Sequence, residues 1–383
     1  MAIEIVDTLS GIPAGQWNSL AGGEPFLSHE FFSALHETGC ASGATGWTPQ
    51  FLLLRKNGAL AGAMPLYLKA HSYGEYVFDW AWADAYHRHG IAYYPKLLSA
   101  VPFTPVSGSR LLTATDDARE ALIRGALQLA REFRVSSLHC LFPKREEAAQ
   151  MVRHGMMPRT TVQFHWENRG YAGFDEFLAG FSHDKRKKVR QERRKVRDAG
   201  IRYRWLEGDE IRERDWAFFE RCYRQTYHDH HSSPYLTLEF FCRIGRTLPQ
   251  HMVLILAERD GVPVAASLNI RDTHRLCGRY WGAVEYHSGL HFETCYYQGI
   301  EYCIARGIAH FEGGSCGEHK LARGLMPVET CSAHWLAHPE FANAIEQFLR
   351  REAGGLETYV DELKERSPFK NPAASAAPAH DLP

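Results

Sequence analysis

Residues that could form an amide bond gather late in the chain, between positions 278 and 330. A glycine-rich stretch from Gly313 follows an apolar run that is typical of a strand, and glycine-rich loops after strands often form the rim of an active site. A carboxylate or neutral imidazole can take the proton of an attacking amine, and a nearby cation can stabilise the developing oxyanion. The candidates for these catalytic roles are His291, Glu293, Glu318, His319 and Lys320. His291 and Glu293 would also suit the start of a helix, as cap and dipole partners.

Aromatic and basic side chains are interleaved with these residues, where a plain strand and helix would need only apolar ones. They could shape an acyl or acceptor channel and hold phosphate or developing negative charge. The candidates for substrate binding here are Arg279, Tyr280, Trp281, Tyr296, Tyr297 and Arg323. The two adjacent tyrosines fit core packing equally well, with their hydroxyls at the surface.

A second group of aromatic and charged residues lies around proline and glycine turns between positions 71 and 110. Such a mixture suits a pocket for a peptide-like or sugar substrate. The candidates are His71, Glu75, Asp79, Trp80, Lys96 and Arg110. An ordinary packed loop explains the same residues equally well.

The segment 185–197 holds nine basic residues in thirteen and predicts a helix. At helical spacing Arg186, Arg190 and Arg193 share one face, while Val189 and Val196 form a narrow apolar seam. A solvated surface is the plain interpretation of a charge run. The formal net charge of the chain is only −1, however, so concentrating arginines on one face favours a phosphate-rich ligand. Acyl-CoA, a tRNA acceptor stem and a nucleotide-sugar diphosphate are all open.

Several function classes are disfavoured. The near-neutral charge gives no global attraction to DNA or anionic membranes, and the apolar runs are too short to span a membrane. The nine cysteines stand singly and the N-terminus does not resemble a signal peptide, so we expect a reducing cytoplasm. The histidine run at 228–231 is typical of a polar helix end, and we predict no metal. Residues 367–383 are rich in proline and alanine and predict a disordered tail.

Two halves of the chain repeat one order of elements. Apolar hairpins with an Asn-Gly or Asp-Gly turn are expected at 51–66 and 252–269, and each is followed later by a helix and a strand. The helices are expected at 117–133 and 290–305, and the strands at 135–142 and 308–312. This order is that of the N-acetyltransferase (GNAT) fold, so we predict a tandem α+β duplication with mixed sheets. The expected domains are 1–170 and 200–366, joined by a basic helical connector at 171–199.

The same stretches carry a family resemblance. The segments HSYGEYVFDW, YYPKL, PFTPVSG, GRYWG, LHFE and GEHK, in this order, resemble the FemAB-like predicted N-acyltransferases of bacteria, and the match spans most of residues 25–336. That family is similar to the Fem peptidyltransferases, which use two GNAT-like domains to transfer amino acids from aminoacyl-tRNA to amines of peptidoglycan precursors. The resemblance implies a duplicated GNAT fold and amide-bond chemistry without a tightly bound cofactor.

The resemblance leaves the substrates open. The Gly-rich pyrophosphate loop of acetyl-CoA enzymes is missing, since residues 285–291 read EYHSGLH, and this favours aminoacyl-tRNA or another donor over acetyl-CoA. The expected donor is aminoacyl-tRNA or acyl-CoA, the expected acceptor a small-molecule or peptide amine, and tRNA is a candidate partner. A cell-wall peptide or nucleotide-sugar recognition protein without catalysis, and an RNA-binding protein, are the alternatives.

Overall fold

A computed structural model describes residues 2–314 and 317–370 of the chain, which divide into two compact units. Unit 1 comprises residues up to 161 together with 235–244 and 329–356, and unit 2 comprises the others. The expected domain boundaries at 170 and 200 differ from this division. The segment 171–199 packs within unit 2 and is no separate connector, because Val189 and Val196 are buried in the apolar clusters of that unit. Long-range strand pairing also assigns part of the C-terminal half to unit 1.

The strands of unit 1 belong to two sheets. A small sheet has the strand order β1-β3-β4, and the other strands have the order β2-β5-β6-β7-β14-β8 within an 11-stranded sheet. The strands are β1 (Ala2–Val6), β2 (Trp47–Pro49), β3 (Phe51–Lys56), β4 (Ala59–Met64), β5 (Tyr67–Lys69), β6 (Lys96–Ser99), β7 (Ser137–Leu141), β8 (Met157–Glu167) and β14 (Met326–Leu336). Strands β8 and β14 each continue into unit 2. The hairpin predicted at 51–66 is confirmed as β3-β4, although it lies in the small sheet.

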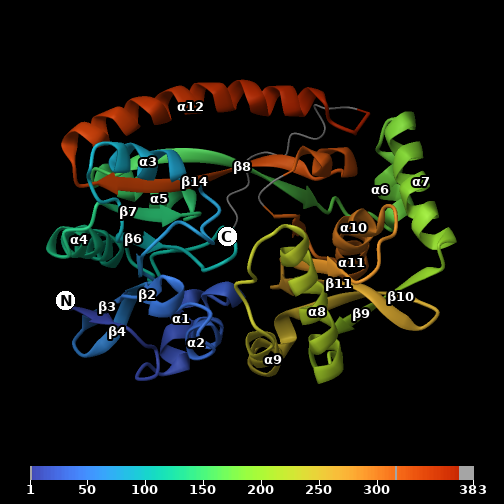
Figure 1. Ribbon diagram of the computed structural model, residues 1–383, viewed down its shortest axis with the longest axis horizontal. Helices are drawn as coiled ribbons and strands as arrows, with labels where there is room; N and C mark the ends of the chain where they lie inside the picture. The colour runs from blue at the N-terminus through green and yellow to red at the C-terminus, as the bar shows by residue number, and fades with distance from the viewer. Residues whose placement is uncertain (1, 315–316, 371–383) are drawn as a thin grey trace. The chain divides into compact units, whose positions relative to one another are not determined.

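Helices cover these sheets. They are α1 (Ala14–Ala21), α2 (His29–Glu37), α3 (Trp80–Arg88), α4 (Asp116–Glu132), α5 (Arg145–Arg153), α9 (Leu238–Thr247) and α12 (Pro339–Glu365), and α9 and α12 also run into unit 2; short 3-10 turns are at η1 (Pro25–Leu27) and η2 (Gly43–Thr45). The predicted helix at 117–133 is confirmed as α4, whose apolar face packs on the core with Leu122 and Leu129 fully buried. Figure 1 shows α1 and α2 beside the β3-β4 hairpin.

Unit 2 has the strand order β8-β13-β12-β11-β10-β9. Its remaining strands are β9 (Ile201–Glu207), β10 (Met252–Arg259), β11 (Val262–Arg271), β12 (Arg275–Ala283) and β13 (His310–Glu312). The predicted hairpin at 252–269 is confirmed as β10-β11, with Asp260 and Gly261 at positive φ in its turn. Its helices are α6 (Phe174–Ala179), α7 (His183–Asp198), α8 (Glu213–Asp229), α10 (Leu290–Phe292) and α11 (Gln298–Arg306), with 3-10 turns η3 (Gly208–Glu210), η4 (Pro249–His251) and η6 (Glu318–Arg323).

The duplication is visible in the strand pairing of each unit. In unit 1, β6 pairs in parallel with β7 over three residue pairs, and α4 lies between them in the chain. In unit 2, β12 pairs in parallel with β13 over three residue pairs, and the α10–α11 segment lies between them. An antiparallel strand follows on the far side of each pair, β14 in unit 1 and β8 in unit 2. Each unit thus repeats one crossover motif.

The helix predicted at 290–305 has an irregularity that matters for function. Between α10 and α11 the chain forms a π turn, Glu293–Tyr297, and Gly307 then ends α11 with a positive φ of 66°. A π turn inserts an extra residue and turns the side chains around it, and such turns are frequent at functional sites. Figure 1 shows this segment beside β11, and α8 lies against β11 and β12.

The start of the predicted tail is ordered. Phe369 packs against Phe177 and Phe181, and the backbone of Lys370 donates a hydrogen bond to the carbonyl of Gly180. Residues 367–370 therefore belong to the core of unit 2, since aromatic rings at 177 and 181 offer Phe369 a place to pack. The rest of the predicted tail, 371–383, lies outside the described residues.

Candidate active site

The π turn and the 3-10 turn η6 bring six of the predicted residues together in unit 2. The imidazole of His291 stacks on Trp281 of β12 at 4.5 Å between ring centroids, and it lies 6.2 Å from the ring of His319. The hydroxyl of Tyr296 is 3.1 Å from Nε2 of His319. Lys320 and Arg323 follow on the same turn. The histidine cluster, as we name His291, Tyr296 and His319, is thus assembled by elements far apart in the sequence.

Both imidazoles are held in their neutral form near neutral pH. Burial, together with the charges of His319, Arg323 and Lys320, lowers the pKa of His291 to about 4. Burial and the charges of Lys320 and Arg323 also lower the pKa of His319. His319 is exposed, and its Nδ1 makes no hydrogen bond to another described residue. A neutral, accessible imidazole is suited to accept a proton.

The other predicted catalytic residues have different surroundings. Lys320 is almost fully buried and its Nζ donates a hydrogen bond to the carbonyl of Gly314 at 3.0 Å. Glu318 lies at the surface and accepts hydrogen bonds from Tyr359 at 3.0 Å and from Arg366 at 2.8 Å. The role predicted for Glu318 in proton transfer stays a prediction, and in this structure both of its oxygens accept hydrogen bonds at the surface. Ser315 and Cys316 of the glycine-rich loop lie outside the described residues.

The second predicted tyrosine is anchored by a residue that the sequence did not single out. Tyr297 is fully buried and its hydroxyl donates to Glu192 of α7 at 2.5 Å. Glu192 also accepts from Arg323, at 2.9 and 3.0 Å to its two oxygens. The guanidinium of Arg323 lies 3.4 Å above the ring of Phe292. Tyr297 and Arg323 thus support the cluster from behind and do not line an open channel.

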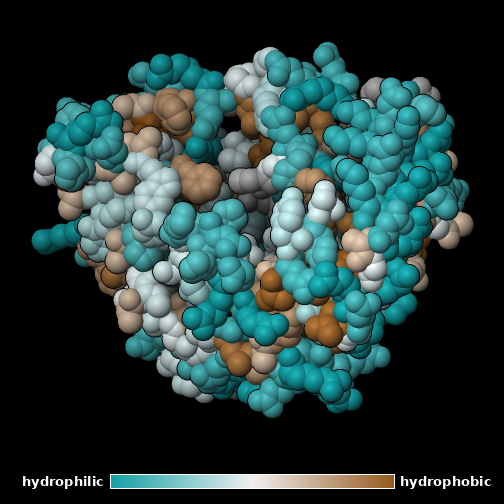
Figure 2. All heavy atoms as spheres, turned by 45° about the vertical axis from the view of Figure 1, so that its right-hand side comes forward, coloured by the Kyte–Doolittle hydropathy of each residue, from teal (hydrophilic) through white to brown (hydrophobic). Residues whose placement is uncertain are grey.

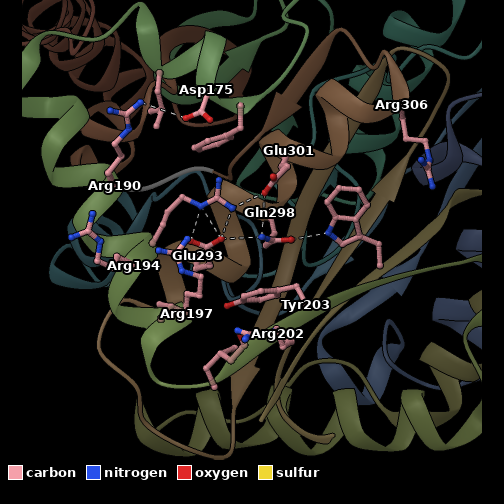
Figure 3. A pocket seen from close by; sticks show the side chains of 16 residues that line it. Asp175, Arg190, Arg194, Arg197, Arg202, Tyr203, Glu293, Gln298, Glu301 and Arg306 are labelled. Carbon is pink, nitrogen blue, oxygen red and sulfur yellow. Dashed lines mark hydrogen bonds and ion pairs between the residues drawn. The ribbon is translucent and has the colours of Figure 1, made fainter. Parts of the chain in front are cut away.

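A groove of about 910 Å³ opens beside α7. Figure 3 shows its walls: Arg190, Arg194 and Arg197 from α7, and Arg202 from β9, extend along one side. Arg190 makes only a long contact of 3.5 Å with Asp175. Within the described residues no carboxylate pairs with Arg194 or Arg197. The face of unit 2 that carries α7 is almost wholly hydrophilic (Figure 2).

The groove differs from the predicted arginine stripe at two positions. Arg193 binds both oxygens of Glu293 at 2.9 to 3.1 Å and also Glu301 at 2.6 Å, so its charge is already neutralised. Arg186 is not among the residues that line the groove. Helical spacing placed Arg193 correctly on this face, but its acidic partners come from the π turn and α11. Arg193 does line the groove, and its predicted phosphate role stays a prediction.

Glu293, predicted as a proton acceptor, is the other half of that ion pair. It is 4% exposed and accepts hydrogen bonds from Arg193 and from Nε2 of Gln298. A carboxylate whose oxygens are occupied by a guanidinium and an amide is poorly placed to take a proton from a substrate. The structure thus assigns Glu293 to holding the π turn against α7.

Two predicted channel residues on β12 pack into the unit. Arg279 donates to Glu312 at 2.7 Å, and Arg275 holds the same carboxylate at 3.0 Å. Burial alone would raise the pKa of Glu312, but the two arginines lower it to about 2. In this structure Arg279 neutralises the buried Glu312, and its predicted role in substrate binding stays a prediction. The ring of Tyr280 packs on Tyr223 of α8 at 5.4 Å.

The predicted cluster at 71–110 is, for the most part, a buried network in unit 1. Lys96 is fully buried and its Nζ donates to Ser72 and Glu75, both at 2.8 Å, and to Asp79. The hydroxyl of Tyr93 donates to Asp79 at 2.6 Å. Lys96 therefore joins Glu75 and Asp79 in a buried ion-pair network. Oε1 of Glu75 and Oδ1 of Asp79 are buried and accept no hydrogen bond from the described residues, and the substrate-binding role predicted for the three residues stays a prediction.

Three other residues predicted in this region make different contacts. Arg110 is fully buried and donates to the backbone carbonyls of Val106, Gly108, Ser109 and Leu141, so it fixes a loop. His71 contacts the carbonyl of Thr45 at 3.1 Å. Trp80 is 41% exposed and packs edge-on against Tyr73. Of this group, Trp80 is exposed and His71 is partly exposed, so a ligand could reach both.

A buried histidine pair makes unit 1 sensitive to acid. His139 and His334 face each other across β7 and β14 with 2.7 Å between their Nδ1 atoms. Burial, with Lys96 and Arg159 nearby, lowers the pKa of His139 to about 3, and burial and His139 lower that of His334 well below its usual value. Since the unfolded chain binds protons below about pH 6.5 that the folded one does not, stability is lost as the pH falls from about 6.5.

We therefore predict that the free energy of unfolding falls between pH 6.5 and 4.5, by up to about 1.4 kcal/mol per pH unit for each such proton. Glu75 has the opposite effect on the free energy of unfolding. Burial raises its pKa to about 7, so the folded chain binds this proton before the unfolded one does, and the contribution of Glu75 to stability increases as the pH falls. Urea unfolding across this range measures the slope. In the His334→Asn variant, which keeps a donor and an acceptor, the slope should decrease. A slope equal to that of the natural protein would contradict the prediction.

Comparisons with known proteins agree with this architecture. A family model described as FemAB-like, peptidoglycan biosynthesis/recognition, matches residues 8–371. The chain belongs to the FemAB-like family. No curated protein sequence matches this FemAB-like protein.

Two solved structures with TM-scores above 0.5 show the same fold at low sequence identity, and a third has a lower score. The crystal structure of FemX is 10% identical with a TM-score of 0.55, and the match covers 90% of this chain and 100% of that one. The C-terminal domain of a putative lysylphosphatidylglycerol synthetase from Agrobacterium fabrum is 8% identical with a TM-score of 0.52, covering 87% and 94%. A tandem GNAT protein from the clavulanic acid pathway is 12% identical with a TM-score of 0.44, covering 88% and 99%. The predicted family and the predicted tandem GNAT fold are confirmed for this FemAB-like protein.

Sequence reasoning missed three residues of the FemAB-like site. Arg194 lines the groove, and it could have been found because it lies four residues after Arg190 on the same helical face. Glu192 is one of the few acids within a basic helix, which was a signal for an internal ion pair. Phe292 carries the cation–π contact to Arg323 and had no distinguishing signal. In its described residues, this protein has no helix both long and apolar enough to cross a membrane.

Proposed function

We propose that the protein is an N-acyltransferase that joins an activated acyl group to an amine, with the histidine cluster of unit 2 as its catalytic centre. The observation that carries this proposal is the neutral, accessible imidazole of His319, hydrogen bonded to Tyr296 and adjacent to the cation of Lys320. Membership of a family concerned with peptidoglycan biosynthesis/recognition supports it.

The reaction would proceed by direct transfer. The neutral amine attacks the carbonyl carbon of the donor, a C–N bond forms, and the C–O or C–S bond to the leaving group breaks. His319 takes the proton that the amine nitrogen loses and returns it to the leaving group. The positive charge of Lys320 would stabilise the oxyanion between these two steps.

The groove beside α7 supports a phosphate-rich donor. Arg194 and Arg197 are exposed and have no acidic partner among the described residues, and arginine binds phosphate with two parallel hydrogen bonds. Aminoacyl-tRNA and acyl-CoA both carry such phosphates, and either would serve as co-substrate. The proposed acceptor is an amine of a peptidoglycan precursor or another small metabolite, and the proposed location is the cytoplasm. The eight cysteines of the described residues are all free thiols, which supports a reducing compartment.

An assay of amide formation tests the function. The purified protein is incubated with labelled aminoacyl-tRNA or acyl-CoA and a set of peptidoglycan-type amines, and the products are identified by mass spectrometry. Transfer that requires the protein supports the proposal. Tight binding of a cell-wall peptide or a nucleotide-sugar, without turnover of any donor, would instead indicate a recognition protein.

The groove arginines give a separate prediction. We expect Arg194→Gln combined with Arg197→Gln to weaken donor binding at least tenfold and to flatten its dependence on salt, because two phosphate contacts are lost. Donor affinity is measured at several salt concentrations by fluorescence anisotropy. Arg306→Gln is the control, since Arg306 lines the groove but is already paired with Glu207 at 2.6 Å. Equal weakening in both variants would place the donor elsewhere.

A further inference from the structure

Glu192 lies at the meeting point of three elements of unit 2. It belongs to α7, it accepts a hydrogen bond from Tyr297 at the last position of the π turn, and both of its oxygens accept from Arg323 of η6. The neighbouring residue Arg193 holds Glu293 at the first position of the same turn. Glu192 and Arg193, two consecutive residues of α7, therefore bind the last and the first residue of the π turn.

The contacts of Arg323 extend this network to the histidine cluster. Nη1 of Arg323 donates a hydrogen bond to the backbone carbonyl of His319 at 2.5 Å, and the guanidinium lies over the ring of Phe292. The Phe292 ring in turn lies 5.6 Å from His319 and 5.4 Å from His291. The position of both imidazoles therefore depends on where the guanidinium of Arg323 is held.

The pairing of Glu192 with Arg323 is the only carboxylate contact of this guanidinium among the residues the structure describes, and only 5% of the Arg323 side chain is exposed. A nearly buried cation that loses its counter-charge must find water or move. Either outcome would release the carbonyl of His319 and the stack on Phe292.

We propose that Glu192 is a positioning residue for acyl transfer: it holds Tyr297 and Arg323 so that His291, Tyr296 and His319 face one another. This inference rests on the function proposed above. Glu192 touches no reacting atom and does not line the groove, and helical spacing places it on the side of α7 opposite to Arg194 and Arg197. Its effect should therefore be on the rate constant and not on donor binding.

The test compares Glu192→Gln, which keeps the size and removes the charge, with Asp198→Asn on the same helix. Asp198 is exposed and has no ionic partner among the described residues, so its variant should resemble the natural protein. We expect Glu192→Gln to lower kcat about 10- to 100-fold, since small displacements of catalytic groups have effects of this size. The Kd for inorganic pyrophosphate, measured by calorimetry, should change less than twofold. Glu192→Asp, which keeps the charge, should recover most of the rate.

A second readout does not depend on activity. The imidazole signals of His291 and His319 in NMR spectra are shifted by the rings of Trp281, Tyr296 and Phe292, and in Glu192→Gln they should move toward unstructured values. Tyr297→Phe should give a smaller change in the same direction, and it serves if Glu192→Gln does not fold. Unmoved histidine signals, or an unchanged kcat, would overturn the proposal. If the natural protein transfers no acyl group while the signals still move, the proposed function fails and the positioning of the histidines stands.

Discussion

Replacing His319 by alanine is expected to lower kcat/KM for amide formation by about 10²- to 10⁴-fold, the usual contribution of a general base. The amine must lose a proton as the C–N bond forms, and His319 offers an accessible neutral imidazole next to Tyr296. Burial and the nearby cations lower the pKa of His319, which favours its neutral form. Initial rates of the purified variant measure the loss.

The pH profile separates this role from a structural one. In the natural protein kcat/KM should fall on the acid side, below about pH 6.5, as His319 is protonated, and this acid limb should be missing from the residual activity of His319→Ala. His183→Ala is the control, because His183 is an exposed histidine at the start of α7 and lies outside the cluster. A His319→Ala variant that keeps more than a tenth of the activity would assign the proton transfer elsewhere, with His291 as the next candidate.

Local patterns in the sequence predicted the elements of the fold well. The turns at Asn57 and Asp260 take the positive φ that a tight hairpin requires, and short apolar runs indicated the strands before them. The end of α11 was readable from Gly307, which adopts the left-handed conformation that favours glycine. These features depend on neighbouring residues, so a sequence contains them directly.

The distribution of strands over two sheets could not be predicted in the same way. The hairpins β3-β4 and β10-β11 have similar sequences, but the first pairs with β1 and the second with β9. The pairing of each hairpin is decided by strands elsewhere in the chain, and β14 pairs with β7 across nearly two hundred residues. Such long-range pairing has no local signature.

The candidate site was predicted by residue type but only partly by role. His291, Tyr296, His319 and Lys320 do converge, because the π turn and η6 bring them to one place. Glu293 and Arg193 were each predicted to act on substrate, and instead they neutralise each other. These two residues are a hundred positions apart, and the sequence alone does not show that their side chains meet. In the same way, the sequence alone did not show that Lys96 pairs with Glu75 and Asp79.

The second large effect is expected in unit 1: Lys96→Met should lower the free energy of unfolding by roughly 3 to 5 kcal/mol, the usual cost of removing one partner of a buried ion pair. Lys96 is fully buried and donates to Glu75 and Asp79. Burial alone would raise the pKa of Asp79, but the charge and the hydrogen bond of Lys96 outweigh it and hold that pKa far below its usual value. Without Lys96, Asp79 is left as a buried acid with a weakened counter-charge. Urea unfolding followed by circular dichroism gives the change.

A rescue experiment decides whether the loss comes from charge or from packing. Lys195→Met on the exposed side of α7 is the control for a lysine-to-methionine change and should cost little. Adding Glu75→Gln and Asp79→Asn to Lys96→Met removes both acids that lost their partner, so much of the stability should return. If the triple variant is no more stable than Lys96→Met, the methionine itself is badly accommodated, and the network would not owe its stability to its charges. Because all three side chains are buried, recovery in the triple variant would also show that the charges of this group depend on one another for the stability of unit 1.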